Sequence, residues 1–431
     1  MEQLFFPTSD FLMVDTNATN LHKAKVPINI GMELAARNFK ADMCHWKDTI
    51  DIGKYSTIGF SVVWPMFALN IYPFLKRHKI ESLKERRDKD APAILIGGQG
   101  AMGIPGTLSE IANYVYPGEI GDPLTFKNGF FREPELISPP VIKNGKAIIE
   151  ITRGCKYRCK FCVYAHRLGG PYREKSIGLV REQIDYCLSK DIDNILFRTI
   201  NFPGYKWFDE LRELAIKNHI YQGWGDITVK EADKIIPYLA KMRITQAKMG
   251  VESFDENTRK EIDKYFSDDC LDHVIEETLL QCHMIHLYLI YGLPGDNYDN
   301  WIKWVYRLDK IRKTIPHPVR IVFSITNFMP TPGTPMENCP DINYEDREEF
   351  QRRWVGACRD AGFYSKEWDV KTGNDFGHFG RSELPHKVIM HLWRGHSNIT
   401  DAILAVKAGV GRYIRRPQAE AFLKAIEGDL R

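Results

Sequence analysis

The chain has 431 residues, of which 44% are hydrophobic and 27% charged. This length and apolar content exclude a disordered chain and a small disulfide-stapled protein, and they predict two or three domains. The formal net charge of +3 is too balanced to require a nucleic-acid or membrane partner.

The first segment, residues 1–140, alternates strand-like and helix-like stretches. Residues 11–14, 57–63 and 93–96 are nearly continuous apolar runs bounded by turn residues, which is typical of buried strands in a parallel sheet. A helix is predicted at 30–39, and the Pro/Gly-rich stretch 129–145 is interpreted as a linker. We therefore expect a Rossmann-like α/β domain.

The second segment, residues 141–335, repeats a strand followed by a helix six times. Helical spacing is clear in two of the intervening stretches, 177–188 and 301–311. The pattern predicts a parallel sheet that curls into a partial (β/α)6 barrel, with the chemistry at the C-terminal ends of the strands. The candidate strands are 147–152, 194–198, 221–226, 246–251, 286–293 and 319–326.

The last segment, residues 336–431, is less regular and rich in Trp, His and Arg. We expect a small, mostly helical C-terminal region that ends in a helix at 417–427. The N-terminal residues Met1, Glu2 and Gln3 lack the positive charge of a signal peptide. The uncharged run 55–75 is interrupted by polar residues and prolines, so we expect a cytoplasmic protein without a membrane span.

Three of the nine cysteines form a CxxxCxxC loop directly after a predicted strand: Cys155, Cys159 and Cys162. A tight local cluster in a long chain with an odd cysteine count favours metal binding over disulfides. Three thiolates would leave one iron of a four-iron cluster open to a substrate or cofactor. His166 offers an alternative, because it would complete a Cys3His zinc site.

The segment EITRGCKYRCKFCVYAH around these cysteines resembles the signature loop of the radical S-adenosylmethionine (SAM) enzymes. KMGVESFDENT (248–258), LIYGLPGDNYDNW (289–301) and FMPTPGTPM (328–336) resemble later segments of that family in the same order. The resemblance implies a [4Fe-4S] cluster on Cys155, Cys159 and Cys162. It also implies reductive cleavage of SAM to a 5′-deoxyadenosyl radical, with a reductant such as flavodoxin or ferredoxin as partner.

The resemblance also implies cofactor-binding residues, each with a plainer structural alternative. Phe161 would lie beside the SAM adenine or simply be a core aromatic. Glu252 and Ser253 would hold the ribose or amino-acid part, although Ser253 to Glu256 also fits a capping box. Gly292 and Gly295 would approach the adenine or only make a turn.

The Gly-Gly-Glu segment that the family often uses for the SAM amino group is missing after the second strand. Phe197 to Phe202 stands in its place, with Thr199 and Asn201 as weak candidates for that contact. Arg198 and Asp226 also lie at strand ends, where they would face SAM or substrate, or form a structural ion pair.

The N-terminal segment contains GxGxxG at 98–103, with Glu119 about twenty residues later, as in dinucleotide sites. Pro105 delays the helix that such a site needs. The order of Gly97 and Gly98, YPGEIGDP (116–123) and the cysteine loop instead resembles the cobalamin-binding subclass of radical SAM enzymes. There the two glycines approach the cobalamin tail. The subclass motif DxHxxG is missing, so the resemblance leaves cobalamin binding open.

The leading hypothesis is a radical SAM enzyme of the cobalamin-domain type that acts on a small molecule or nucleotide. With cobalamin we expect methyl transfer to an unactivated carbon, and without it rearrangement, ring formation or oxidation. A second hypothesis makes the substrate a nucleic-acid base, bound by the basic and aromatic residues Trp393, Arg412, Tyr413, Arg415, Arg416 and Lys424. A third is a non-catalytic zinc or iron–sulfur protein.

Overall fold

The computed structural model forms two compact units, one within residues 1–134 and the other within 135–373. The structure describes residues 10–16, 32, 36, 40–63, 65–98, 100–101, 108–116, 136–168, 170–328, 330, 333–340 and 344–363.

The first unit is built on a five-stranded sheet in which every neighbouring pair is parallel. Its order, β2-β1-β3-β4-β5, is one of the two common orders of doubly wound α/β folds, and it confirms the Rossmann-like expectation. The strands are β1 (Phe11–Asp15), β2 (Asp42–His45), β3 (Thr57–Ser61), β4 (Ala93–Gly97) and β5 (Tyr114–Tyr116).

The three central strands of this sheet were predicted, and the two edge strands were not. The central strands are apolar, and β3 is buried at all five residues. The edge strand β2 has the sequence DMCH with two exposed residues, and β5 has only three residues. Short, partly polar edge strands lack the apolar run that marks a buried strand. Helix α2 (Ile71–Arg77) packs Ile71, Phe74 and Leu75 into the same core.

Gly98 follows β4 with φ +107°, a conformation that favours glycine. A Cβ atom there would lie 2.4 Å from the carbonyl oxygen of Val62, which follows β3. The same carbonyl accepts a hydrogen bond from the amide of Gly100 at 2.9 Å. Packing of two neighbouring strand ends therefore requires a glycine at position 98. Of the GxGxxG stretch, residues 99, 102 and 103 lie outside the described part, as does Glu119.

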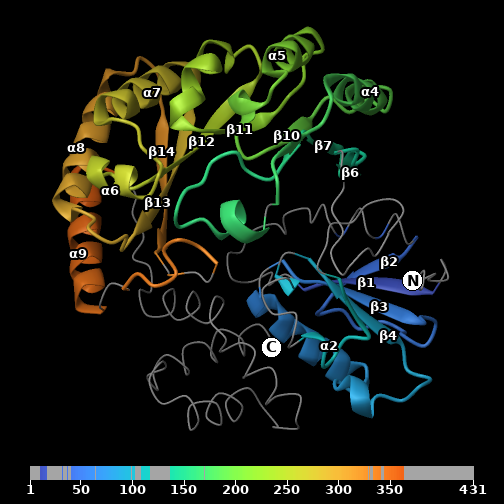
Figure 1. Ribbon diagram of the computed structural model, residues 1–431. Helices are drawn as coiled ribbons and strands as arrows, with labels where there is room; N and C mark the ends of the chain where they lie inside the picture. The colour runs from blue at the N-terminus through green and yellow to red at the C-terminus, as the bar shows by residue number, and fades with distance from the viewer. Residues whose placement is uncertain are drawn as a thin grey trace. The chain divides into compact units, whose positions relative to one another are not determined.

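The second unit contains all six predicted strands, and Figure 1 shows helices α4, α5, α7 and α8 along their outer side. Sheets β10-β7-β6 and β11-β12-β13-β14 are joined by a parallel bridge between Asn194 and Tyr221. The six strands thus follow one another in chain order, which confirms the partial-barrel expectation. They are β7 (Lys146–Glu150), β10 (Ile195–Arg198), β11 (Gly223–Ile227), β12 (Ile244–Glu252), β13 (Met284–Tyr291) and β14 (Arg320–Asn327).

Helices α4, α6, α7 and α8 of this unit start at side-chain caps and bury one stripe against the strands. Ser176 caps α4 and Ser267 caps α7, each accepting a hydrogen bond from the amide three residues on. The predicted stripes at 177–188 and 301–311 fall in α4 and α8. The helices are α4 (Ile177–Leu188), α5 (Phe208–Lys217), α6 (Glu256–Glu261), α7 (Asp268–Gln281), α8 (Tyr298–Thr314) and α9 (Tyr344–Asp360).

The interpretation of 129–145 as a linker is wrong for its last residues. Strand β6 (Val141–Lys143) pairs antiparallel with β7 through a tight hairpin. Asn144 and Gly145 at its turn have φ values of 51° and 69°. Asn-Gly with two positive φ angles is the preferred two-residue hairpin connection, so this dipeptide makes a turn within the sheet.

Side chains alternate along β12 between the helices and the concave face of the sheet. Ala247, Met249 and Val251 are buried under the helices, whereas Lys248 and Gly250 are partly accessible on the other face. The same alternation along β13 places His286 and Tyr288 on the concave face. A strand that buries one face and exposes polar groups on the other leaves the barrel interior available to a ligand.

The C-terminal expectation is tested only in part. Helix α9 lies within residues 336–431, but the predicted helix 417–427 and the basic and aromatic residues of the tail lie outside the described residues. The three domain boundaries stay predictions. In the described part of the chain, each helix is too short or too polar to span a lipid bilayer.

Candidate active site

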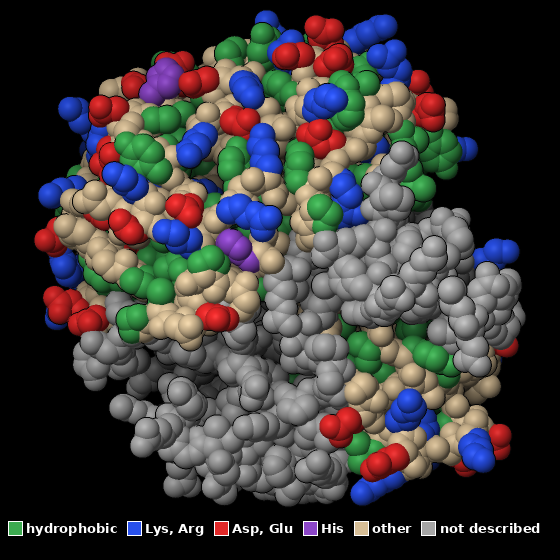
Figure 2. All heavy atoms as spheres, in the orientation of Figure 1, with side chains coloured by type: hydrophobic (Ala, Val, Ile, Leu, Met, Phe, Trp, Pro, Cys, Tyr) green, Lys and Arg blue, Asp and Glu red, His purple; other side chains and the backbone are tan. Residues whose placement is uncertain are grey.

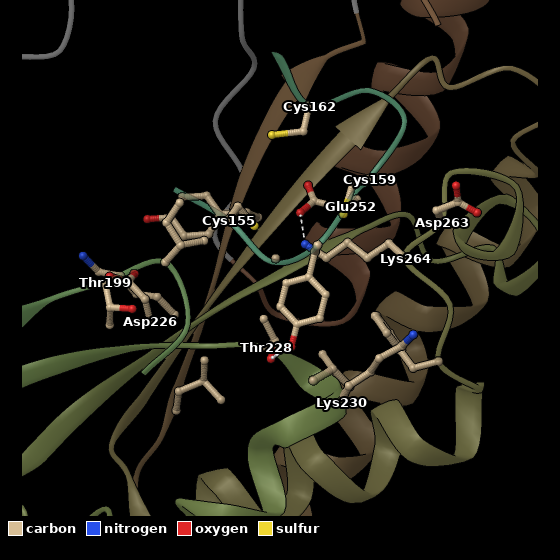
Figure 3. A pocket seen from close by; sticks show the side chains of 18 of the residues that line it. Cys155, Cys159, Cys162, Thr199, Asp226, Thr228, Lys230, Glu252, Asp263 and Lys264 are labelled. Atoms are coloured by element: carbon tan, nitrogen blue, oxygen red, sulfur yellow. Dashed lines mark hydrogen bonds and ion pairs between the residues drawn. The ribbon is translucent and has the colours of Figure 1, made fainter. Parts of the chain in front are cut away.

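The cysteine loop and the strands of the second unit line a cavity of about 370 Å³. Cys155, Cys159 and Cys162 form one wall, and residues from the ends of β10, β11, β12 and β13 and from the segment after α6 form much of the rest. Figure 3 shows the loop passing over the side chains that rise from these strands. The cavity lies where a β/α barrel carries its chemistry, at the C-terminal ends of the strands.

The loop turns sharply after the short strand β8 (Thr152–Arg153). Gly154 has φ +83°, and a Cβ there would lie 2.5 Å from the carbonyl oxygen of Pro171. Its amide donates to the hydroxyl of Tyr164 at 3.1 Å. Tyr164 begins a π-helical turn (Tyr164–Leu168), a rare conformation that is frequent at functional sites. The backbone is thereby fixed on both sides of the cysteines.

Glu231, on the 3₁₀ helix Val229–Lys234, anchors the loop from the other side of the cavity. It accepts hydrogen bonds from Tyr157 at 2.5 Å and from Lys156 at 3.1 Å. Asn201 and Lys234 donate to the same carboxylate. Burial alone would raise the pKa of Glu231, but these donors outweigh it and lower the pKa to about 2.

Replacing Glu231 by glutamine should loosen the loop and destabilise the protein by about 1.5–3 kcal/mol at pH 7, since hydrogen bonds to a charged group are lost. The lowered pKa means that the carboxylate contributes above about pH 4.5 and loses this contribution as the pH falls toward 2. Urea unfolding at several pH values measures both effects. Glu213→Gln, at a side chain that is 76% exposed, is the control. Equal stabilities of Glu231→Gln and wild type at pH 7 would contradict the anchoring role.

All nine cysteines have free thiols. Burial raises the pKa of Cys155, and it raises the pKa of Cys159 to about 11, while the ammonium of Lys264 opposes this rise at both thiols. A metal binds the thiolate, so these cysteines need either a metal or a nearby cation to deprotonate.

The geometry of the described residues does not support the zinc alternative. Among the described residues, no three His, Cys, Asp or Glu side chains are arranged to hold one metal ion. Nε2 of His166 instead contacts the carbonyl oxygen of Cys159 at 3.1 Å. In a [4Fe-4S] cluster each thiolate binds a different iron, so its three cysteines need not converge on one point. The arrangement fits a cluster better than a mononuclear site.

Glu252 and Lys264 form an ion pair at 2.6 Å beside Cys159, drawn as a dashed line in Figure 3. Glu252 ends β12 with φ +67°, and the register between β12 and β13 shifts between Gly250 and Glu252. A non-glycine residue in this conformation is uncommon and marks functional sites more often than ordinary strand ends. The bulge directs the carboxylate into the cavity.

The predicted cofactor residues divide into two groups. Phe161, Thr199 and Glu252 line the cavity. Asn201, Ser253, Gly292 and Gly295 are not among the lining residues, and Gly97 and Gly98 belong to the other unit.

The side chains outside the cavity have structural partners. Asn201 joins the Glu231 network. Ser253 is fully buried and donates to Asp296 at 2.7 Å. The predicted capping box at Ser253 is displaced, because Asp255 caps α6 by accepting from the amide of Thr258 at 2.9 Å. The expected contacts of Asn201 and Ser253 with SAM stay predictions.

Asp296 is a buried acid behind the site. One of its oxygens accepts from Ser253 and, at 3.0 Å, from Trp301 Nε1. Its other oxygen has no hydrogen-bond partner in the part of the chain that the structure describes. Burial raises the pKa of Asp296 to about 7, against the opposing effect of these hydrogen bonds.

Asp296→Asn should stabilise the protein at pH 8 and have little effect at pH 5. The folded state holds a proton that the unfolded state releases near pH 4, so wild-type stability falls from about pH 4 to about pH 7. The loss amounts to at most about 4 kcal/mol, and asparagine keeps the acceptor oxygen without titrating. Thermal unfolding from pH 5 to 8 measures it, with the exposed Asp269→Asn as control. Identical pH profiles for Asp296→Asn and wild type would refute the assignment.

Sequence reasoning missed Lys264, Lys248 and Tyr288, which also line the cavity. Lys248 and Tyr288 alternate with buried apolar residues along β12 and β13, and this alternation could have marked them as facing the interior. Lys264 lies after α6, and no pattern in the sequence links it to Glu252.

Residues 149–305 match the family model of the Radical SAM superfamily. This part of the chain is a radical SAM domain, as the resemblance of the cysteine loop predicted. No curated protein matches the sequence.

The fold is similar to that of two cobalamin-dependent members of this superfamily. The radical SAM methyltransferase TsrM from Kitasatospora setae, solved with cobalamin and a [4Fe-4S] cluster, has a TM-score of 0.55 at 12% identity, covering 89% of this chain and 98% of its own. The enzyme OxsB, solved with aqua-cobalamin and SAM, has a TM-score of 0.54 at 12% identity, covering 98% of this chain and 80% of its own. At these identities the similarity establishes the fold.

Proposed function

We propose that this protein binds a [4Fe-4S] cluster through Cys155, Cys159 and Cys162 and uses it to cleave SAM reductively. The observation that carries the proposal is the placement of three free thiols on one rigid loop over a cavity in a radical SAM domain. A bound cluster would pass an electron to SAM, and the SAM would break into methionine and a 5′-deoxyadenosyl radical that abstracts hydrogen.

The residues around the cavity support this chemistry in distinct ways. Glu252 offers a carboxylate that can accept hydrogen bonds from the hydroxyl or ammonium groups of SAM, and Lys264 offsets negative charge on the thiolates. Phe161 offers an aromatic face for the adenine. Apolar side chains such as Ile200, Ile227 and Phe266 exclude water from a reactive radical. Thr199, Asn201, Ser253, Gly292 and Gly295 remain proposed SAM contacts.

For the reaction, we propose methyl transfer to an unactivated carbon with cobalamin as second cofactor. The sheet order of the first unit and the fold similarity to TsrM and OxsB, both solved with cobalamin, support this. Gly97 and Gly98 leave an accessible backbone without side chains at the C-terminal end of β4, which suits a bulky ligand. A flavodoxin or ferredoxin would supply electrons.

The nucleic-acid alternative has no support among the described residues. On the face shown in Figure 2, Lys and Arg side chains of the second unit are interspersed with Asp and Glu, and the described surface there shows no continuous basic patch. Such mixed surfaces are typical of proteins that do not bind a polyanion.

Anaerobic reconstitution with iron, sulfide, SAM, dithionite and hydroxocobalamin tests the proposal. Mass spectrometry should detect 5′-deoxyadenosine and a bound corrinoid. Absence of 5′-deoxyadenosine from cluster-loaded protein would refute SAM cleavage. Absence of corrinoid would refute only the cobalamin part.

A further inference from the structure

A second group of charged side chains lines the same cavity below the level of Glu252 and Lys264. It consists of Arg198 at the end of β10, Asp226 on β11 and Lys248 on β12. The strand register places Asp226 directly opposite Lys248. Lys248 precedes Glu252 by four residues, or about 13 Å along a strand. The cavity therefore has two tiers of charged side chains. The lower tier consists of Arg198, Asp226 and Lys248, and the upper tier consists of Glu252 and Lys264 beside the cysteine loop.

Arg198 lies close to the level of Asp226. The bridge between Asn194 and Tyr221 sets the register of the two strands and aligns Arg198 with Gly225, one residue before Asp226. Asp226 is close enough to feel the positive charges of Lys248 and Arg198, which oppose the rise in its pKa that burial causes. The three side chains thus share one electrostatic environment.

Arg198 and Asp226 nevertheless do not pair with each other. Among the described residues, neither side chain takes part in a hydrogen bond or an ion pair, although both line the cavity. The described residues thus show no direct ion pair at Arg198 or Asp226, although their charges interact. A half-buried carboxylate without a hydrogen-bond donor is costly, and a ligand that donates to it removes this cost.

The two groups differ in the chemistry that they recognise. A guanidinium presents a planar fork that matches a carboxylate, whereas an aspartate attracts an ammonium group. Lys248 adds a second positive charge, so the tier as a whole favours a carboxylate with an amine beside it. Above it, Ile200 and Tyr288, which are 42% and 38% exposed, offer apolar surface toward the cysteine loop.

We propose that Arg198 and Asp226 bind the carboxylate and the ammonium group of a free α-amino acid, which is the substrate of this enzyme. The proposal rests on the proposed SAM chemistry and deepens it. The side chain of the amino acid extends up the cavity toward the cysteine loop, where the radical forms. The amino and carboxylate groups of SAM itself are bound in the upper tier, so the two zwitterions use different groups of the protein.

The test is equilibrium binding of the twenty L-amino acids to cluster-loaded protein saturated with SAM, by calorimetry under anaerobic conditions. At least one amino acid should bind, and its amine and carboxylic-acid analogues should bind about tenfold to a hundredfold more weakly, since each lacks one charge-assisted contact. The Arg198→Met protein should bind the amino acid and its amine analogue with equal affinity. The Asp226→Asn protein should bind the amino acid and its carboxylic-acid analogue with equal affinity.

Two variants serve as controls, and two outcomes would contradict the proposal. Arg181→Met and Asp185→Asn remove the same charges from the exposed side of α4 and should change nothing. Iron content and SAM affinity of the Arg198 and Asp226 variants should equal those of wild type. Failure of all twenty amino acids to bind overturns the proposal, as do variants that weaken SAM binding instead. Formation of 5′-deoxyadenosine in the same samples shows separately whether the SAM chemistry holds.

Discussion

Cys159→Ala is expected to abolish SAM cleavage and to prevent stable binding of iron, while the chain stays folded. Cys159 is the most buried of the three loop cysteines, at 9% exposed, and lines the cavity beside Lys264. Two remaining thiolates cannot hold a cluster that needs three protein ligands. Iron and acid-labile sulfide analysis after anaerobic reconstitution, together with assay of 5′-deoxyadenosine, measures the effect.

The matched control is Cys270→Ala, which removes a partly buried thiol from α7, far along the chain from the loop and outside the cavity. It should keep the wild-type iron content and cleavage rate. Thermal unfolding of both apo variants separates loss of ligand from loss of fold. SAM cleavage by Cys159→Ala would remove this residue from the ligand set.

Lys264→Met is expected to lower the affinity of the protein for the cluster by about tenfold to a hundredfold. This is the usual effect of removing a group that supports metal ligands. Lys264 bonds to Glu252 at 2.6 Å, and its charge opposes the burial that raises the pKa of Cys159 to about 11. Without it, Glu252 and the thiolates lose their shared counter-charge. Iron retention during dialysis against a chelator reports this loss independently of turnover.

Lys160→Met is the control for Lys264→Met, because Lys160 is a loop lysine whose ammonium contacts the carbonyl oxygen of Glu261 and Asp263 outside the Glu252 pair. The double variant Glu252→Gln/Lys264→Met tests the pairing itself. If Lys264 acts on the thiolates directly, the double variant stays as weak as Lys264→Met. Recovery of iron retention in the double variant would show that Lys264 only neutralises Glu252.

The strands could be predicted from the sequence because they carry long apolar runs covered by helices. β12 and β13 were placed to within two residues at each end. β2, β5 and β6 were missed because each has three or four residues, too few for a periodic pattern. Asn144 and Gly145 were interpreted as a linker since a hairpin turn and a linker share the same composition.

The site could be predicted only where spacing carries the chemistry. The three cysteines lie within eight residues, so one loop must hold them together. Lys264 meets Glu252 only because a strand bulge and a positive φ turn Glu252 toward it, and neither feature is visible in the residue types. Arg198 and Asp226 were recognised as strand-end charges, but whether they pair depends on side-chain positions that register alone does not give.

Elemental analysis of anaerobically prepared protein, with Mössbauer spectroscopy of ⁵⁷Fe-loaded samples, tests the central claim most directly. The loop of Cys155, Cys159 and Cys162 predicts about four irons and four sulfides per chain, with one iron site that changes its spectrum when SAM is added. Stoichiometric zinc without acid-labile sulfide, or a cluster whose four iron sites all ignore SAM, would contradict it.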